Sequence, residues 1–190
     1  MIRYLATALR ITILSIVIFG LIYPFVMTGL AQLIFPKQAN GSLVERKGKI
    51  VASDLVGALW TRPQYFQGRP SSAGKNGYDP TSTGGTNLGP SSKKLIDSTK
   101  ATIGALEKAN PDAAGPPPMD LVTSSGSGID PDISPASAYW EAPRVAAARK
   151  LPLIRINALI SAHVHERELG FLGEPHVNVT ELNLALDGGK

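Results

Sequence analysis

The stretch YDPTSTGGTNLGPSSKKL, residues 78–95, combines three glycines, six serines and threonines and two lysines, a composition typical of phosphate-binding loops. A P-loop needs G-x-x-x-x-G-K-[ST], in which the lysine follows the second glycine. Gly84 and Gly89 have this separation, but Pro90 occupies the lysine position and removes a backbone N–H donor from it. We therefore do not expect a nucleotide cradle here.

The serines of TSSGSGIDPDISP, residues 123–135, are candidates for acyl transfer. A nucleophile elbow has the pattern G-x-S-x-G on a turn that leads directly into a helix. Ser125 and Ser127 lack the first glycine, and no helix is expected before Ser134. The sequence indicates that these serines have no catalytic role.

Three histidines and several carboxylates raise the question of a metal site. His163 and His165 are two residues apart, and if they lie on a helix they do not share a face. The run HVHE, with His176 further along the chain, does not match H-E-x-x-H. Asp130 and Asp132 lack the other ligands of a calcium loop. We expect no metal site, and the chain has no cysteine for a thiolate site or a disulfide.

The three unusual loops, residues 68–74, 78–95 and 123–135, are therefore interpreted as ordered structure. Asn, Asp, Ser and Thr side chains bond to nearby backbone groups, and glycine and proline set the turns. Such loops hold a fixed shape without regular strands. They would suit docking to another protein.

The segment ITILSIVIFGLIYPFVMTGLAQLIFP, between Arg10 and Lys37, contains no ionisable acid or base. About 20 apolar residues span a bilayer as a helix, and a cleaved signal peptide would be shorter with a small-residue cleavage site. We predict a retained transmembrane helix over residues 11–35, after a short tail at 1–10. Pro24 is expected to kink it. Small and polar residues on one stripe favour contact with another membrane helix, namely Thr28, Gly29 and Gln32.

Residues 36–190 are predicted to form a single loop-rich α+β domain. A hairpin is expected from the short runs 43–44 and 50–51 around a turn at Lys47-Gly48. Helices are expected over 91–109, from Ser134 with a break near Pro143, over 153–166 and over 179–186, with a short strand at 121–122. The net charge is +4, and no basic run is interleaved with aromatics, so nucleic-acid binding is not expected.

The charges that flank the span do not decide its orientation. Counted directly, the basic residues after the span place the domain in the cytoplasm, but long domains are translocated with little regard to charge.

Several long blocks resemble the C subunit of the Kdp potassium-transporting ATPases. They are YPFVMTGLAQLIFPKQANGS, YFQGRPSSAG, YDPTSTGGTNLGPSSKKL, DLVTSSGSGIDPDISPASAYWEAPRVAAAR and GEPHVNVTELNLALD. The resemblance covers essentially the whole chain. Asp132 stands where it leads us to expect histidine, and Trp60-Thr61-Arg62 where a glycine-containing loop is expected.

The resemblance implies a non-catalytic, single-span accessory subunit of the inner membrane, with an extracytoplasmic domain. Its implied partners are a channel-like potassium-translocating subunit and a P-type ATPase subunit, which handle K⁺ and ATP, and the lipid around the span. The family is also described as a catalytic chaperone that raises the ATP affinity of the ATPase subunit. An external domain cannot touch cytoplasmic ATP, and the absence of a phosphate loop favours the membrane role.

Arg69, Asn87 and Tyr139 are the candidate contacts between the loops and a partner, because they are polar or aromatic residues of the kind enriched at interfaces. The alternative from another class is a membrane-anchored hydrolase or solute-binding domain of the cell envelope. Activity of the purified chain alone, dependent on a serine or histidine, would favour the hydrolase.

Overall fold

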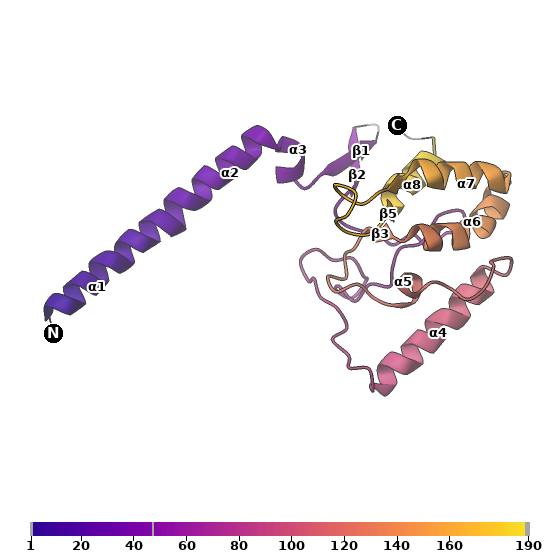
Figure 1. Cartoon of the computed structure of the whole chain (residues 1–190), viewed down its shortest axis with the longest axis horizontal. Coiled ribbons are helices and arrows are strands. Elements are labelled where there is room, and N and C mark those ends of the chain that lie inside the picture. Colours follow the sequence, from indigo (N-terminus) through magenta and orange to yellow (C-terminus); the bar gives the residue numbers. More distant parts are fainter. Residues whose placement is uncertain (1, 47, 189–190) are drawn as a thin grey trace. The chain divides into compact units, whose positions relative to one another are not determined.

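A computed structural model describes residues 2–46 and 48–188 of the chain (Figure 1). The chain divides into two compact units between Leu43 and Val44.

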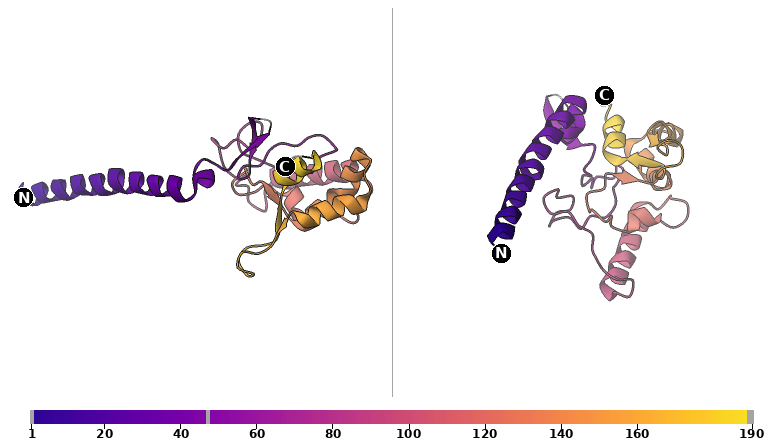
Figure 2. Two further views of the ribbon diagram at one scale, coloured as in Figure 1. Left: turned by 90° about the horizontal axis from the view of Figure 1, so that it is seen from above. Right: turned by 60° about the vertical axis from the view of Figure 1, so that its left-hand side comes forward.

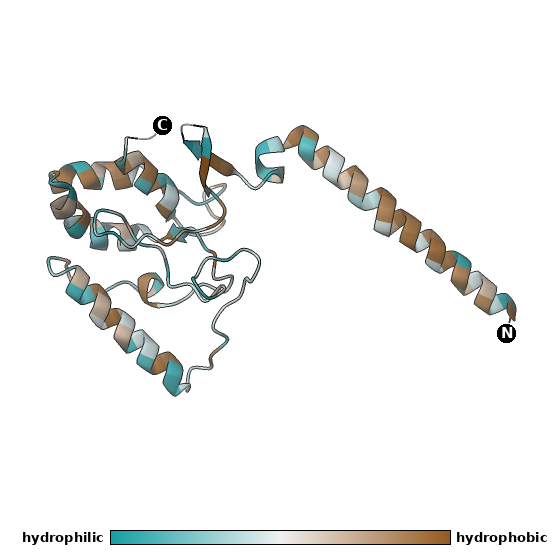
Figure 3. Cartoon of the chain, turned by 180° about the vertical axis from the view of Figure 1, so that it is seen from behind, coloured by the Kyte–Doolittle hydropathy of each residue, from teal (hydrophilic) through white to brown (hydrophobic). Residues whose placement is uncertain are grey.

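The first unit contains a continuous apolar helix from Ile2 to Ile34, 33 residues long. It consists of α1 (Ile2–Ser15), the π-helical segment η1 (Ile16–Ile22) and α2 (Tyr23–Ile34), and the short helix α3 (Pro36–Ala39) follows. None of the residues of α1, η1 and α2 is buried, and Figure 3 shows brown, hydrophobic residues along most of this helix. At about 1.5 Å per residue it is longer than the hydrocarbon core of a bilayer. The helix therefore has the length and composition of a membrane span.

The helix accommodates Pro24 by widening the turn that precedes it. Pro24 has no N–H and its ring clashes with the carbonyl four residues earlier in a regular α-helix. The N–H of Tyr23 bonds to the carbonyl of Ile18, five residues earlier, which is the π-helical pattern. The helix then continues to Ile34.

A hairpin of β1 (Leu43–Arg46) and β2 (Lys49–Ser53) follows, as the short runs 43–44 and 50–51 predicted. Of the expected turn Lys47-Gly48, Lys47 lies outside the described residues. Gly48 has φ +73°, a value that glycine adopts without strain.

The core of the second unit is a small antiparallel sheet covered by three helices. The strand order is β3 (Asp132–Ile133), β5 (His176–Asn178) and β4 (Val164–His165). Ile133 and Val164 both pair with Val177, so these three side chains lie on the inner face. The helices are α6 (Pro135–Arg149), α7 (Leu153–Ala162) and α8 (Val179–Leu186), and α6 packs most extensively against α7. None of these three strands was predicted from the sequence, since each has only two or three residues.

The helix α6 begins as predicted, because Ser134 caps it and accepts a hydrogen bond from the N–H of Ser137. The expected break at Pro143 is wrong, since the helix continues to Arg149. Pro143 removes one backbone bond, to Tyr139 on the exposed side of the helix. Burial of Glu141, Ala142 and Val145 around it keeps the helix in place.

The predicted third helix ends earlier than expected. It stops at Ala162, and His163 follows as its C-cap with Nδ1 close to the carbonyl oxygen of Leu159, at 2.8 Å. Val164 and His165 form β4 and pair with β5. Strand pairing thus outweighs the helical periodicity, and the two histidines do not lie on one helix.

The helix α4 (Lys93–Ala109) confirms the prediction for this segment, with Ser92 before it and Asn110 after it. Its one buried residue among those described is Leu106, and Figure 1 shows most of its length standing apart from α6, α7 and α8. The expected strand at 121–122 is wrong. Leu121 and Val122 end a single helical turn, α5 (Met119–Val122), which starts after Pro118 and buries both side chains.

Candidate functional site: a loop framework around a cavity

A buried ion pair on α6 anchors the chain segment 63–67. Glu141 and Arg144 lie one helical turn apart and bond to each other, and both are buried. Arg144 also donates to the carbonyl oxygens of Pro63 and Tyr65 and to the side chain of Asn110. The second carboxylate oxygen of Glu141 accepts from the N–H of Gln67, at 2.8 Å. Apart from its bond to Asn110 at the end of α4, the pair thus bonds only to the irregular segment 63–67 among the described residues.

The environment of Glu141 also changes its proton affinity. Burial raises the pKa of Glu141 to about 7, although Arg144 and the N–H of Gln67 act in the opposite direction. The group therefore titrates near neutrality while it holds the loop.

Asn183 of α8 fixes the same loop from the other side. Its Oδ1 accepts from the N–H of Phe66 at 2.8 Å, and its Nδ2 donates to the carbonyl of Phe66 at 2.9 Å. The side chains of both residues are fully buried. Phe66 is thereby part of the core although it belongs to no strand or helix.

The hydroxyls of the loop 68–74 bond to the backbone of other loops. Ser71 Oγ donates to the carbonyl of Gly128 and accepts from the N–H of Tyr78, at 2.5 and 2.7 Å. Ser72 Oγ donates to the carbonyl of Gly84 at 2.6 Å. The three loops singled out in the sequence are therefore connected to one another through serine hydroxyls.

Segment 63–67 and the loops 68–74, 78–95 and 123–135 together form what we call the framework. Tyr78 and an ion pair complete it. The hydroxyl of Tyr78 donates to the carbonyl of Arg69, and Arg69 pairs with Asp130 at 2.9 Å. Burial raises the pKa of Tyr78 to about 12, with the negative charge of Asp130 adding to the shift. A Cβ on Gly57 would overlap the Tyr78 ring, so only glycine fits there.

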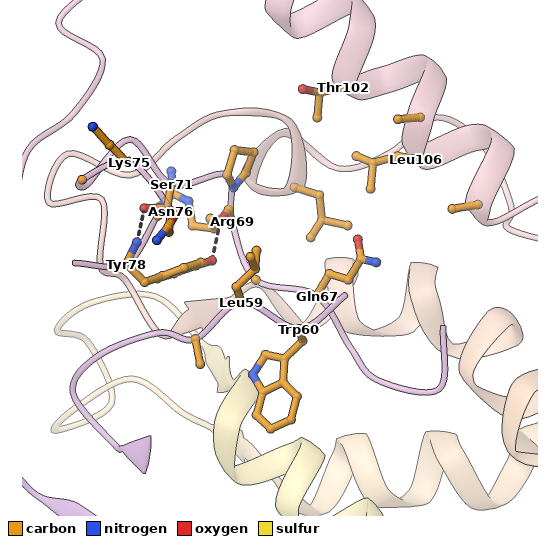
Figure 4. A pocket seen from close by; sticks show the side chains of 18 residues that line it. Leu59, Trp60, Gln67, Arg69, Ser71, Lys75, Asn76, Tyr78, Thr102 and Leu106 are labelled. Atoms are coloured by element: carbon orange, nitrogen blue, oxygen red, sulfur yellow. Dashed lines mark hydrogen bonds between the residues drawn. The ribbon is translucent and has the colours of Figure 1, made fainter. Parts of the chain in front are cut away.

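The framework and α4 line a cavity of about 570 Å³ that is open to solvent (Figure 4). One part of its wall is polar, with Lys75 and Asn76, and Leu59 and Leu106 contribute apolar surface. Two donors of the lining residues, Trp60 Nε1 and Arg69 Nε, are buried without a hydrogen-bond partner in the described part of the chain. A cavity of this volume has room for water that would accept from them.

Ser125 and Ser127, for which the sequence predicts no catalytic role, both bond to the backbone. Ser125 Oγ accepts from the N–H of Gly128 at 2.9 Å, and Ser127 Oγ accepts from the N–H of Ile129 at 3.2 Å. Both bonds close tight turns of the loop.

The histidines lie differently from the arrangement assumed in the sequence analysis. His165 and His176 are opposite each other on β4 and β5, with their rings stacked 5.3 Å apart. His165 Nε2 lies 3.2 Å from Glu181 Oε2. Burial raises the pKa of Asp132, whereas the positive charge of His176 and His165 would lower it. Within residues 2–46 and 48–188, no three or more His, Asp or Glu side chains lie close enough together to hold a metal ion.

The predicted contact residues are dispersed rather than gathered in one place. Arg69 lines the cavity and is engaged with Asp130. Asn87 is exposed in a left-handed conformation with φ +51°, and Tyr139 lies on the exposed side of α6. Gln32 of α2 and Asn40, the residue after α3, exchange two side-chain hydrogen bonds, at 3.1 and 3.3 Å. Thr28 and Gly29 are exposed, and a Cβ on Gly29 would meet nothing within 4 Å.

Sequence reasoning missed Glu141, Arg144 and Asn183, which hold the framework together. The signal for the first two was present, since a Glu and an Arg three residues apart stand among small and apolar residues in AYWEAPRVAAA. Charged residues on an otherwise apolar helix face are buried only when they are paired. Asn183 carried no comparable signal.

The described residues define a class of protein with one helix long enough to cross a membrane and an α+β unit built around hydrogen-bonded loops. Residues 5–188 match the family described as KdpC: K⁺-transporting ATPase, c chain. The chain belongs to this family.

Three relatives have the name potassium-transporting ATPase KdpC subunit. The protein of Gemmatimonas aurantiaca is 50% identical over 98% of this chain and 94% of its own length. That of Myxococcus xanthus is 52% identical over 95% and 86%, and that of Acidobacterium capsulatum is 50% identical over 97% and 98%. The resemblance stated from the sequence is confirmed.

Proposed function

We propose that this chain is a non-catalytic accessory subunit of an ATP-driven potassium uptake complex, required for the assembly and stability of that complex. One observation carries the proposal. The hydroxyls that the sequence offered as candidate nucleophiles, on Ser125 and Ser127, bond to backbone groups of their loop, and the hydroxyl of Ser71 bonds to the backbone in the same way. Groups that serve as hydrogen-bond partners of the backbone maintain a shape, and a fixed shape is what a docking subunit needs.

In this proposal the chain crosses the inner membrane once, through residues 11–35, after a tail at 1–10. Residues 36–190 form the extracytoplasmic part. Lipid surrounds the free sides of the helix, and the stripe of Thr28, Gly29 and Gln32 packs against a membrane helix of a partner. Arg69, Asn87 and Tyr139 remain the proposed contacts of the outer loops.

The proposed partners are the channel-like potassium-translocating subunit and the P-type ATPase subunit. The ATPase subunit supplies the phosphorylated aspartate, and those two subunits handle K⁺ and ATP. This chain binds neither firmly. A chaperone effect on ATP affinity would then act through the partners, since an extracytoplasmic unit does not reach cytoplasmic ATP.

The cavity supports a second candidate, a membrane-anchored solute-binding domain of the cell envelope. Its volume of about 570 Å³ is in the range of small-molecule sites, and its wall combines Lys75 and Asn76 with apolar surface. A hydrolase is less well supported, because the serines have structural partners.

Purification of the complex with and without this chain tests the proposal. The other subunits are expected to co-purify in lower yield, with less potassium-dependent ATP hydrolysis, when this chain is deleted. Full-length chain added back before solubilisation should restore both. Ester hydrolysis by the purified chain alone, abolished by Ser125→Ala, would instead establish an enzyme. Unchanged assembly and turnover without the chain would contradict the proposal.

A further inference from the structure

The connection between β4 and β5, residues 166–175, exposes three large apolar side chains at its tip. Leu169 is 84% exposed, Phe171 72% and Leu172 58%. In the left view of Figure 2 this gold-coloured connection projects from the rest of the second unit. Single exposed apolar residues are normal on protein surfaces, whereas a group of adjacent ones marks an interaction site. We call these three residues the apolar tip.

Local bonds hold the apolar tip in one conformation. The N–H groups of Phe171 and Leu172 both bond to the carbonyl of Glu168, at 3.2 and 2.9 Å. Below the tip, Arg167 and Glu174 form an ion pair at 2.7 Å. Further down, the stacked rings of His165 and His176 join the two strands.

The backbone of the apolar tip is also strained. Leu169 has φ +53°, a conformation that costs a non-glycine residue about 1 kcal/mol or more and is found at functional loops. A loop that presents apolar side chains in a fixed, strained conformation loses little entropy when it binds. The tip is therefore prepared for a partner that has a defined shape.

The charges around the tip indicate the chemistry of that partner. Exposed Glu166, Glu168 and Glu174 surround it, and the single cation, Arg167, is paired with Glu174, so the segment has a net charge of −2. Loops and helices that enter a bilayer surface usually present lysine and arginine to the anionic lipids. Carboxylates around an apolar tip are complementary to basic residues around an apolar pocket.

We propose that Leu169, Phe171 and Leu172 dock into an apolar pocket with a basic rim on another subunit of the same ATPase. This inference rests on the proposed function. Three side chains bury too little area to hold two proteins together alone. The membrane helix supplies the first attachment, because only eight residues, 35–42, separate it from β1 and they span about 28 Å at most. Such a link gives the tip a high effective concentration at its pocket.

A fluorescent label at the tip provides a direct test, since the natural chain contains no cysteine. Phe171→Cys is labelled with a small environment-sensitive thiol dye. Ile154→Cys on α7 is the matched control, because Ile154 is 76% exposed. Quenching by iodide reports access from water, and quenching by nitroxide lipids reports insertion into the bilayer. Both are measured on the full chain alone in vesicles and in the reconstituted complex.

The label at position 171 is expected to be quenched by iodide in the chain alone and to lose about fivefold of that quenching in the complex, since docked anchors are shielded from solvent. The control should be quenched equally in both. Lipid quenching of the chain alone would identify the bilayer as the partner and overturn the proposal, as would unchanged iodide quenching in a complex that contains the chain.

The charge argument has its own variant, Glu168→Lys. It should reduce the amount of chain that co-purifies with a tagged partner subunit, most strongly at low salt, while Lys150→Glu, at the exposed C-cap of α6, should not. If the wild-type chain fails to co-purify at all, the proposed function is wrong. If it co-purifies and position 171 stays open to iodide, only the docking of the tip is wrong.

Discussion

The amide side chain of Asn183 binds the backbone of Phe66 through both its oxygen and its nitrogen, in the manner of a neighbouring strand. The two residues are 117 positions apart in the sequence, and both are fully buried. A loop segment is thus included in the core by a side chain that replaces sheet hydrogen bonds. The buried N–H and carbonyl of Phe66 would otherwise lack these partners.

Asn183→Leu is expected to destabilise the second unit by about 2–4 kcal/mol, because it leaves two buried backbone groups without partners. Both tryptophans, Trp60 and Trp140, belong to this unit, so their fluorescence follows its unfolding in the full-length chain. Urea unfolding in detergent gives the difference. Asn76→Leu, at an exposed position, should change the midpoint little. Equal effects of the two substitutions would disprove the role assigned to Asn183.

Glu141→Gln should reduce the pH dependence of stability between pH 5 and pH 7.5. The pKa of Glu141 is raised to about 7 in the folded chain, so the folded state binds a proton more tightly than the unfolded state. The stability due to this group is complete below its unfolded pKa and is lost as the pH rises through about 7. The wild type should therefore lose more stability over this interval than the variant. The free energy of unfolding is measured for both proteins across this pH interval. An equal change in the two would contradict the raised pKa assigned to Glu141.

Tyr78 should remain protonated in the folded chain at pH values where a tyrosine in a short peptide ionises. Burial raises its pKa to about 12. Absorbance at 295 nm during titration of the wild type minus that of Tyr78→Phe isolates its contribution, which should rise only near pH 12 or when the unit unfolds. The lost hydrogen bond to Arg69 should cost about 1 kcal/mol. A difference signal with a midpoint near pH 10 in the folded protein would show that the phenol is accessible.

Ser125→Ala should lower stability by about 1 kcal/mol and leave potassium-dependent ATP hydrolysis of the assembled complex in place. The reason is that the hydroxyl accepts from the N–H of Gly128. Ser127→Ala and His163→Ala should behave in the same way. Loss of hydrolysis by any of the three, in a complex that still assembles, would identify that side chain as a participant in turnover.

Gly29→Ile should weaken association with partner subunits by about 1–2 kcal/mol, a typical contribution of close contacts between membrane helices. The new side chain meets nothing within the chain itself, so the fold should be unaffected. Co-purification with a tagged partner measures the effect. Leu30→Ile, in the same helix but outside the stripe of Thr28, Gly29 and Gln32, is the control. Both variants should remain in the pellet after alkaline carbonate washing, and release of either would mean that the helix does not span the membrane.

The sequence predicted the elements that depend on local signals. The helices at 93–109, 135–149 and 179–186 begin after residues that favour caps, and the apolar helix is evident from its composition. The strands β3, β4 and β5 are too short for a periodic pattern, and their pairing depends on residues more than ten positions away. For the same reason helix periodicity misplaced His165, and β-propensity misplaced Leu121.

The loops could be recognised as ordered from their composition, but their partners could not. Ser71 bonds to Gly128 and Tyr78 bonds to Arg69 because the chain folds back on itself, and nothing in either segment specifies the other. The buried pair of Glu141 and Arg144 follows the helical spacing, so its existence could be inferred. Its bonds to residues 63–67 required the structure.

The wide turn before Pro24 has a consequence for how a single helix meets its neighbours. A π-helical turn contains more residues than an α-helical one, so the side chains of α2 are rotated about the axis relative to the pattern that α1 would continue. The stripe of Thr28, Gly29 and Gln32 is therefore out of phase with any stripe on α1. One span can then contact two different proteins at two depths of the bilayer, each through a separately oriented seam.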